Sequence, residues 1–184
     1  MGKTILKYFL GLVLFPLTIL FLILKFVSKK ISKVFLSRYL SSVQIHELDC
    51  ICGEEFEDFV YILFTSLGFS VKKTKKSHDY GADLIIKIKD IKIILQCKLY
   101  TSHNVSLNAV QEVYSAVKFY NGSIGIVLSN TYFTKSAINL ATSTNVLLWD
   151  RTMLEKLLKL NKQEKIKFKK ELSYKLENFN KNTI

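Results

Sequence analysis

Two short apolar runs separated by a polar pair constrain the fold of this chain most. Leu84–Ile88 and Ile91–Leu95 flank Lys89-Asp90. Runs of β-branched residues of this length are typical of buried strands, and a polar pair between them indicates a hairpin turn. The two runs therefore predict an antiparallel hairpin with a largely apolar body.

Three polar side chains lie at the open end of this hairpin. If Lys89 and Asp90 are the two turn residues, Asp83 falls directly opposite Gln96. Lys98 is two residues beyond Gln96, so the period of two places both on the same face. Lys-Asp is not a strong turn pair, and a slip of one or two residues stays open. Under either register, a carboxylate, an amide and an ammonium gather at one end.

This pattern is similar to a known family. Asp83, a hairpin and Gln96-Cys97-Lys98 resemble the Asp…(Glu/Gln)-x-Lys core of the restriction-endonuclease-like nucleases, and more narrowly the Mrr type, which uses Gln-x-Lys. Flanking segments extend the resemblance over roughly residues 53–154. They are Gly53-Glu54-Glu55-Phe56-Glu57, Leu67-Gly68-Phe69, Asp79-Tyr80-Gly81-Ala82-Asp83, Ala109-Val110-Gln111-Glu112 and Phe133-Thr134-Lys135-Ser136-Ala137. The resemblance implies an α/β fold with a mixed β-sheet core flanked by helices.

The resemblance also implies a catalytic site. Asp83, Gln96 and Lys98 would be the catalytic residues, and Asp83, Gln96 and Glu57 the ligands of Mg2+ or Mn2+. Magnesium prefers oxygen ligands, and Gln96 offers only a neutral carbonyl oxygen. Glu57 and the backbone carbonyl of Cys97 could compensate for part of the missing charge. Helical spacing places Glu57 at the edge of an apolar face, where a plain boundary residue is the alternative.

Several more polar residues near this motif have two interpretations each. A cationic stretch precedes Asp83 and could contact DNA phosphates or simply be solvated. It contains Lys72, Lys73, Lys75 and Lys76. Asp79 could assist the site or form an Asx-type turn before Gly81. Gln111 could support the site or be an ordinary residue on a helix surface.

The N-terminal region has the composition of a membrane anchor. Residues 8–24 contain no charged side chain, and residues 1–27 are predicted to form a single transmembrane helix. A cleaved signal peptide and a buried helix are the alternatives. More cations follow this stretch than precede it, which predicts that the following domain is in the cytoplasm, at the cell membrane. Residues 28–45 are predicted to form a basic linker helix on anionic lipid headgroups.

The remaining chain is predicted to form a nuclease domain at 46–160 and a basic helix or tail at 161–184. Strands alternating with helices in the later half indicate a layered α/β domain. The expected helices are 49–67, 105–120, 135–141 with Thr134 as its cap, and 150–160; the expected strands besides the hairpin are 69–71, 125–128 and 146–149. The basic tail could lie on membrane or nucleic acid, or fray in water.

These patterns together predict a membrane-anchored, Mg2+-dependent endonuclease that hydrolyses phosphodiester bonds in DNA. The formal net charge of +12 favours polyanionic partners, either DNA or an anionic membrane face. Nucleases of the family often act as dimers, so a homodimer is possible. The main alternative is a catalytically inactive DNA-binding module tethered to the membrane. Asp83 and Lys98 could also form a plain salt bridge at a sheet edge, or the chain could be a membrane scaffold without nucleic-acid affinity.

Overall fold

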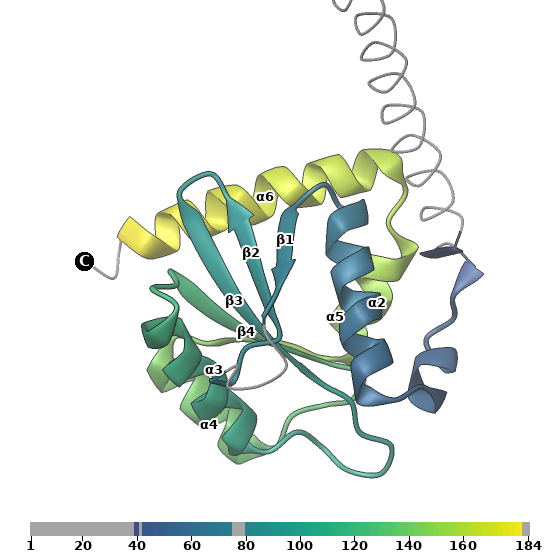
Figure 1. Cartoon of the computed structure of the whole chain (residues 1–184), viewed down its shortest axis with the longest axis horizontal. Coiled ribbons are helices and arrows are strands. Elements are labelled where there is room, and N and C mark those ends of the chain that lie inside the picture. Colours follow the sequence, from purple (N-terminus) through teal and green to yellow (C-terminus); the bar gives the residue numbers. More distant parts are fainter. Residues whose placement is uncertain (1–38, 41, 75–79, 182–184) are drawn as a thin grey trace, which may run out of the picture. The chain divides into compact units, whose positions relative to one another are not determined.

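A five-stranded mixed sheet forms the centre of the domain (Figure 1). The computed structural model describes residues 39–40, 42–74 and 80–181. The strands are β1 (Ser70–Lys73), β2 (Leu84–Ile88), β3 (Ile91–Lys98), β4 (Ile124–Ser129) and β5 (Leu147–Trp149), in that spatial order. The strands β1, β2 and β3 are antiparallel, whereas β3, β4 and β5 are parallel. This arrangement confirms the predicted mixed sheet.

The central hairpin has the predicted register. Leu84 pairs with Leu95 and Ile88 with Ile91, so Lys89 and Asp90 form the turn without any slip. Lys89 has a φ of 51°, in the left-handed region that a tight two-residue hairpin requires. The apolar pattern therefore determined the register although the turn pair is a weak one.

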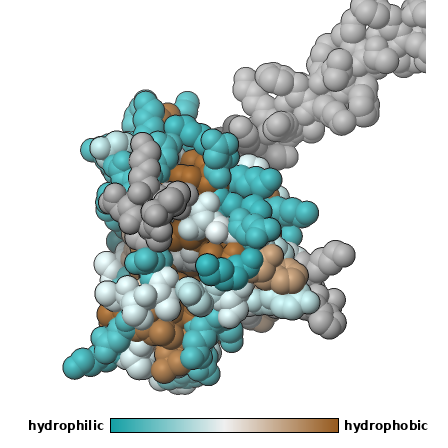
Figure 2. All heavy atoms as spheres, turned by 90° about the vertical axis from the view of Figure 1, so that its left-hand side faces the viewer, coloured by the Kyte–Doolittle hydropathy of each residue, from teal (hydrophilic) through white to brown (hydrophobic). Residues whose placement is uncertain are grey.

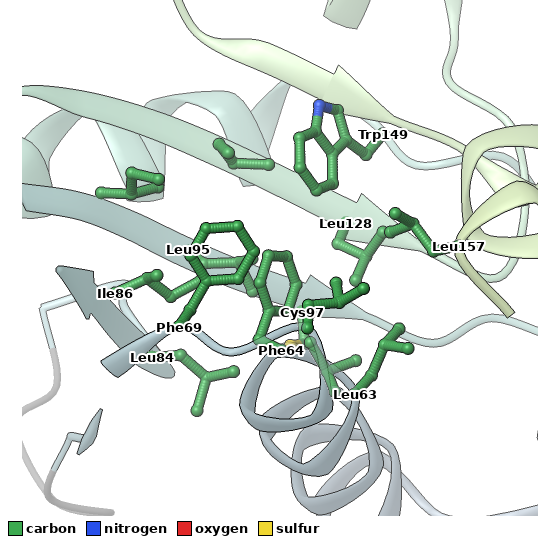
Figure 3. Close-up of a cluster of buried hydrophobic side chains, with 14 of the residues drawn as sticks. Leu63, Phe64, Phe69, Leu84, Ile86, Leu95, Cys97, Leu128, Trp149 and Leu157 are labelled. Atoms are coloured by element: carbon green, nitrogen blue, oxygen red, sulfur yellow. The ribbon is translucent and has the colours of Figure 1, made fainter. Parts of the chain in front are cut away.

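The two faces of the sheet are both covered by helices. One face packs against α2 (Gly53–Ser66) and α5 (Arg151–Lys159), where Phe64 stacks on Trp149 with ring centroids 5.8 Å apart. Figure 3 shows this cluster, with Cys97 and Leu95 among its members. The opposite face contributes Ile94 to a second cluster with α3 (Leu107–Phe119) and α4 (Lys135–Thr144). The outer surface mixes hydrophilic side chains with smaller hydrophobic areas (Figure 2).

The first helix begins later than its apolar spacing suggests. Residues 47–50 form a separate 3-10 turn, η1 (Glu47–Cys50), and α2 begins at Gly53 instead of near Asp49. Cys52 is extended, and its N–H donates to the Glu55 carboxylate at 2.8 Å, which caps the helix at this point. Local capping thus overrides the continuous apolar pattern.

The later elements agree with the expected ones to within a few residues. The Thr134 hydroxyl accepts from the Ala137 N–H at 3.2 Å and caps α4 as predicted. The Asp150 carboxylate accepts from the Met153 N–H at 3.0 Å and caps α5 in the same way. The first strand is shifted, because β1 includes Lys72 and Lys73, which the sequence placed in a loop.

The C-terminal segment forms one long helix, α6 (Lys162–Lys181), whose Leu172 and Leu176 are buried in the core with α2 and α5. Near the start of the described chain, Leu40 is buried in the same core.

The predicted span 1–27 and most of the predicted linker 28–45 lie outside the described residues. Within the described ranges, no helix combines the length and hydrophobicity needed to cross a bilayer.

Candidate active site

The backbone of Asp83 is held between two neighbouring strands. Its N–H donates to the Leu95 carbonyl at 3.0 Å, and its carbonyl accepts from the Thr74 N–H at 2.9 Å. The Thr74 hydroxyl also donates to the Asp83 carbonyl, at 3.1 Å. Asp83 therefore sits at the start of β2 in a fixed position, and it is 7% exposed.

The Asp83 carboxylate faces β3, as the predicted register requires. One carboxylate oxygen accepts hydrogen bonds from the Gln96 side-chain amide at 2.8 Å and from the Cys97 backbone N–H at 2.6 Å. The Gln96 amide also lies 3.4 Å from the Cys97 carbonyl. Asp83 and Gln96 are thus brought into contact, and the Cys97 N–H holds the Asp83 carboxylate against β3.

The Gln96 carbonyl oxygen has a different environment. This atom, Oε1, is buried and has no hydrogen-bond partner among the described residues. An unsatisfied buried acceptor costs about 1–3 kcal/mol, so its presence beside a buried carboxylate requires an explanation. The two side chains together offer oxygen donors of the kind that Mg2+ or Mn2+ prefers. Within the described ranges, no cluster of three or more His, Cys, Asp or Glu side chains is arranged to hold an ion.

Lys98 completes the group at the end of β3. Its ammonium lies 2.6 Å from a carboxylate oxygen of Glu112 on α3. Burial by itself lowers the pKa of Lys98, but the hydrogen bond and the negative charge of Glu112, with a further contribution from Asp83, raise the pKa above its ordinary value. Lys98 is therefore a protonated, half-buried point charge at neutral pH.

Gly81 allows α3 to approach this closely. Its φ is 83°, and an added Cβ would meet the Glu112 backbone carbonyl oxygen at 2.7 Å. Only glycine combines this conformation with such a close backbone contact. Gly81 thus permits the close approach of α3, the helix that carries the Glu112 partner of Lys98.

Glu57 approaches the site from α2. Its side chain is half-buried, and its charge acts on the Cys97 thiol together with that of Asp83. Burial is the main cause that raises the pKa of Cys97 far above its ordinary value, and the two carboxylates raise it further. Glu57 and Asp83 therefore both lie near Cys97.

The remaining predicted residues are only partly described. Lys73 pairs with Asp58 on α2, while Lys72 is exposed on the edge strand β1. Lys75, Lys76 and Asp79 lie outside the described residues. Gln111 is exposed on α3, and the carboxylate that contacts Lys98 belongs to its neighbour Glu112. The roles of all these residues stay predictions.

A family model described as restriction endonuclease, of the Mrr catalytic type, matches residues 48–158. The chain belongs to this family. The matched part contains all five strands, α2 to α4 and α5 except its last residue, and it ends before α6. The chain thus contains a restriction endonuclease domain of the Mrr type, as the Asp83 and Gln96-Cys97-Lys98 motif indicated. No curated protein sequence matches the chain.

Three solved structures are similar to parts of this chain. The DNA modification-dependent restriction endonuclease AspBHI matches with a TM-score of 0.50 and 17% identity over 81% of this chain and 40% of its own. The MspJI restriction endonuclease in complex with a 27-mer oligonucleotide has a TM-score of 0.43 and 17% identity, over 68% and 30%. A protein of unknown function, AF1548, has a TM-score of 0.45 and 16% identity, over 51% and 55%. The matches therefore span 30% to 55% of the length of those chains.

Sequence reasoning missed a polar network beside this Mrr-type site. The Asp49 carboxylate accepts from the Arg151 guanidinium at 2.8 and 3.0 Å and from the Asn130 amide at 2.8 Å. Asn130, 1% exposed, also exchanges hydrogen bonds with the Tyr100 backbone at 2.9 and 3.0 Å. The network holds the segment that follows Lys98. In the sequence, the only sign of this network was Asn130, a polar residue directly after the apolar strand β4.

Proposed function

We propose that this protein is a membrane-anchored DNA endonuclease that hydrolyses phosphodiester bonds and depends on Mg2+ or Mn2+. The observation that carries the proposal is the contact between Asp83 and Gln96, with the unsatisfied Gln96 Oε1 beside them and Lys98 on the same strand. This group lies at the open end of the hairpin in a domain of the Mrr restriction endonuclease family.

The donor set fits a divalent cation. Asp83 and Gln96 would hold the ion, and Glu57, whose charge acts on the neighbouring Cys97, would contribute a second negative charge. A bound ion supplies charge neutralisation at the scissile phosphate and favours ionisation of the attacking water. The Gln96 amide nitrogen now donates to Asp83, so its carbonyl oxygen would have to rotate towards the carboxylate when an ion is present.

The protein groups have separate tasks in this proposal. The Lys98 ammonium would hold the attacking water or a phosphate oxygen as a fixed positive charge. Glu112 keeps this ammonium in place, because the pair is only 2.6 Å apart. The short hydrogen bond from the Cys97 N–H holds the Asp83 carboxylate in its orientation.

DNA is the proposed substrate because the family is one of restriction endonucleases and the chain has a formal net charge of +12. Lys72 is exposed on the edge strand and is available for a phosphate contact. Each chain carries one such site, so cutting both strands at one position would need two chains or two successive events. A homodimer is therefore part of the proposal.

Membrane anchoring is proposed from composition. Residues 8–24 lack charges, and the excess of Lys and Arg after this stretch favours a cytoplasmic position for the nuclease domain at the cell membrane. A tethered nuclease would act on DNA that comes close to the membrane.

The test is cleavage of supercoiled plasmid by the full-length chain in lipid nanodiscs, with Mg2+ and with EDTA. We expect Asp83→Asn to reduce cleavage by about 10²-fold or more, the usual effect of losing one electrostatic stabiliser of the transition state. Asp90→Asn is the matched control, because this exposed turn residue loses the same charge at the far end of the hairpin. Calorimetry with Mn2+ should show binding to the parent and weakened binding to Asp83→Asn.

One observation favours the alternative of an inactive DNA-binding module. The Gln96 amide nitrogen satisfies the Asp83 carboxylate without any metal, and Lys98 is already neutralised by Glu112. Intact plasmid throughout, no Mn2+ binding and retained DNA binding would establish this alternative and exclude the nuclease.

A further inference from the structure

A basic groove runs along α6 at the end of the domain away from the catalytic residues. The groove has a volume of about 660 Å³. Its lining includes five lysines and one glutamate: Lys89, Lys162, Lys165, Lys169, Lys170 and Glu177. Glu177 pairs with Lys89 at 2.8 Å, so the remaining four lysines leave an excess of positive charge. The family match ends at residue 158, and the groove therefore belongs largely to an element added to the Mrr-type domain.

Apolar side chains lie among these cations. Ile166 is 48% exposed and Tyr174 is 67% exposed, and both line the groove. They alternate with Lys162 and Lys170 at four-residue spacing, so the four side chains form one row on the helix surface. Lysines with an aliphatic and an aromatic side chain between them are typical of a helix surface at a membrane–water interface.

Two further lysines of α6, Lys165 and Lys169, contact neutral groups in this groove. Burial lowers the pKa of Lys165, and its contact is the neutral Ser66 hydroxyl at 3.5 Å. Lys169 donates to the Gly68 carbonyl, which is also a neutral acceptor. An anionic group in the groove would compensate both ammonium groups.

One end of the groove lies close to residues 43–45, the first part of the domain. Residues 43–45 and 158–161 line a common cavity of about 580 Å³, and α6 begins at Lys162. Residues 43–45 therefore lie next to the beginning of α6. The Asp83 site is at the opposite end of the hairpin from Lys89, about 20 Å away for six residue steps of about 3.3 Å each. Figure 1 shows α6 crossing the turn end of the hairpin.

From these observations we propose that the α6 groove docks on the anionic phospholipid surface of the membrane. The proposal rests on the membrane anchoring proposed above. The α6 face would rest on lipid headgroups, Ile166 and Tyr174 would enter the interface, and the Asp83–Lys98 end would point away from the bilayer towards DNA. Duplex DNA is a poorer occupant, because exposed Ile166 and Tyr174 gain little from phosphate contacts and the groove is remote from the catalytic residues.

Hydrogen exchange of the full-length chain tests this docking. The chain is reconstituted in vesicles of phosphatidylcholine alone, or of phosphatidylcholine with about one third phosphatidylserine, an anionic lipid that attracts basic segments. We expect amides of α6 to exchange more slowly in the anionic vesicles, and salt at roughly 0.5 M to abolish the difference because salt screens exposed charges. Equal exchange of α6 in both vesicle types would overturn the proposal.

A pair of variants makes the test specific. Lys162→Gln with Lys170→Gln removes two exposed cations of the groove, and each should weaken docking about fivefold. Lys118→Gln with Lys135→Gln is the matched control, since these exposed lysines lie on α3 and α4. We expect only the first pair to lose the lipid-dependent protection. Equal loss in both pairs would reduce the effect to net charge and overturn the proposal.

Two further arms separate the possible outcomes. Flotation with neutral vesicles after a high-salt wash reports the N-terminal anchor alone, so failure of the anchor is distinguishable from failure of the groove. Addition of a duplex of about 30 base pairs to the chain in neutral vesicles tests the rival occupant, whose phosphates would contact the same lysines. Slower exchange of α6 with duplex but not with anionic lipid would assign the groove to DNA and overturn the proposal.

Discussion

At the scale of single residues, the site depends on the chemistry of residue 96. A glutamine contributes a neutral oxygen, and its amide nitrogen is a donor that satisfies Asp83 at 2.8 Å without a metal ion. A glutamate at this position would place two carboxylates in contact, and like charges this close repel. The glutamine thus favours a stable site without metal, and it would hold the proposed ion less tightly than a glutamate.

This reasoning predicts the behaviour of Gln96→Glu. Without metal, the variant should have a lower thermal midpoint than the parent, because the second carboxylate is buried beside Asp83. With Mg2+ it should regain stability and reach half-maximal cleavage at a lower Mg2+ concentration, by about tenfold for roughly 1.4 kcal/mol of added binding energy. Thermal scans and plasmid cleavage across a Mg2+ series are the measurements.

Glu57→Gln is a useful comparison for that variant. It removes a carboxylate near Cys97, whereas Gln96→Glu adds one. We expect it to raise the Mg2+ requirement. A Gln96→Glu variant whose stability does not respond to Mg2+ would contradict the assignment of Asp83 and Gln96 as metal ligands.

The sequence predicted some of the residues that form the site. The register placed Asp83 opposite Gln96 because side chains alternate strictly along a strand and the apolar residues fix the register. The partner of Lys98 was not predictable in the same way. Gln111 and Glu112 are adjacent on α3, and the rotation of the helix about its axis decides which of them reaches Lys98.

At the scale of secondary-structure elements, the site requires α3 to lie directly against the turn before β2. Gly81 permits this contact with a φ of 83° and with the Glu112 backbone against its Cα. Element boundaries were predictable where a side chain caps the helix, as Thr134 does. They were not predictable at Cys52, because a cysteine is an uncommon residue at a helix start.

Gly81→Ala should therefore be more harmful than an ordinary glycine substitution. The left-handed conformation alone costs about 1–2 kcal/mol for alanine, and the clash with the Glu112 backbone adds to this and displaces the Lys98 partner. We expect a lower unfolding temperature and a loss of plasmid cleavage. Circular dichroism melts and the cleavage assay measure the two effects.

Gly68→Ala provides a closely matched control. Gly68 has a φ of 85°, but an added Cβ would meet only the Lys169 side chain, at 3.5 Å. This variant should lose about 1–2 kcal/mol from the strained φ and retain cleavage. Equal loss of cleavage in both variants would show that strain, and not the position of α3, affects activity.

At the scale of the whole molecule, the network around Asp49 connects parts of the domain that are far apart in sequence. Asp49 lies just before α2, Asn130 just after β4, and Arg151 at the start of α5. Sequence patterns did not reveal it, because hydrogen bonds between polar residues of three separate segments leave no periodic signal. The predicted layers, in contrast, follow from apolar periodicity, which each element carries by itself.

The network makes a definite prediction about acid stability. The hydrogen bonds from Arg151 are the main cause that lowers the pKa of Asp49 below its ordinary value of 3.8. A lowered pKa in the folded state means that Asp49 stabilises the fold fully above pH 3.8. This contribution decreases as the pH falls from 3.8 through the folded-state pKa. We expect Asp49→Asn to cost about 1.5–3 kcal/mol near neutral pH, as for hydrogen bonds to a charged group, and progressively less in acid.

Unfolding monitored by the single tryptophan, Trp149, measures this directly, because Trp149 stacks on Phe64 in the core and precedes Arg151 by two residues. Glu155→Gln is the control: Glu155 also pairs with Arg151, but at 3.6 Å within one helix turn, and such a pair contributes about 0.3–0.5 kcal/mol. A cost for Asp49→Asn that is the same at neutral pH and in acid, or no larger than that of Glu155→Gln, would contradict the prediction. If the cost instead follows the titration of Asp49, a single carboxylate links η1, β4 and α5, and acid should loosen the segment after Lys98 before the apolar core itself unfolds.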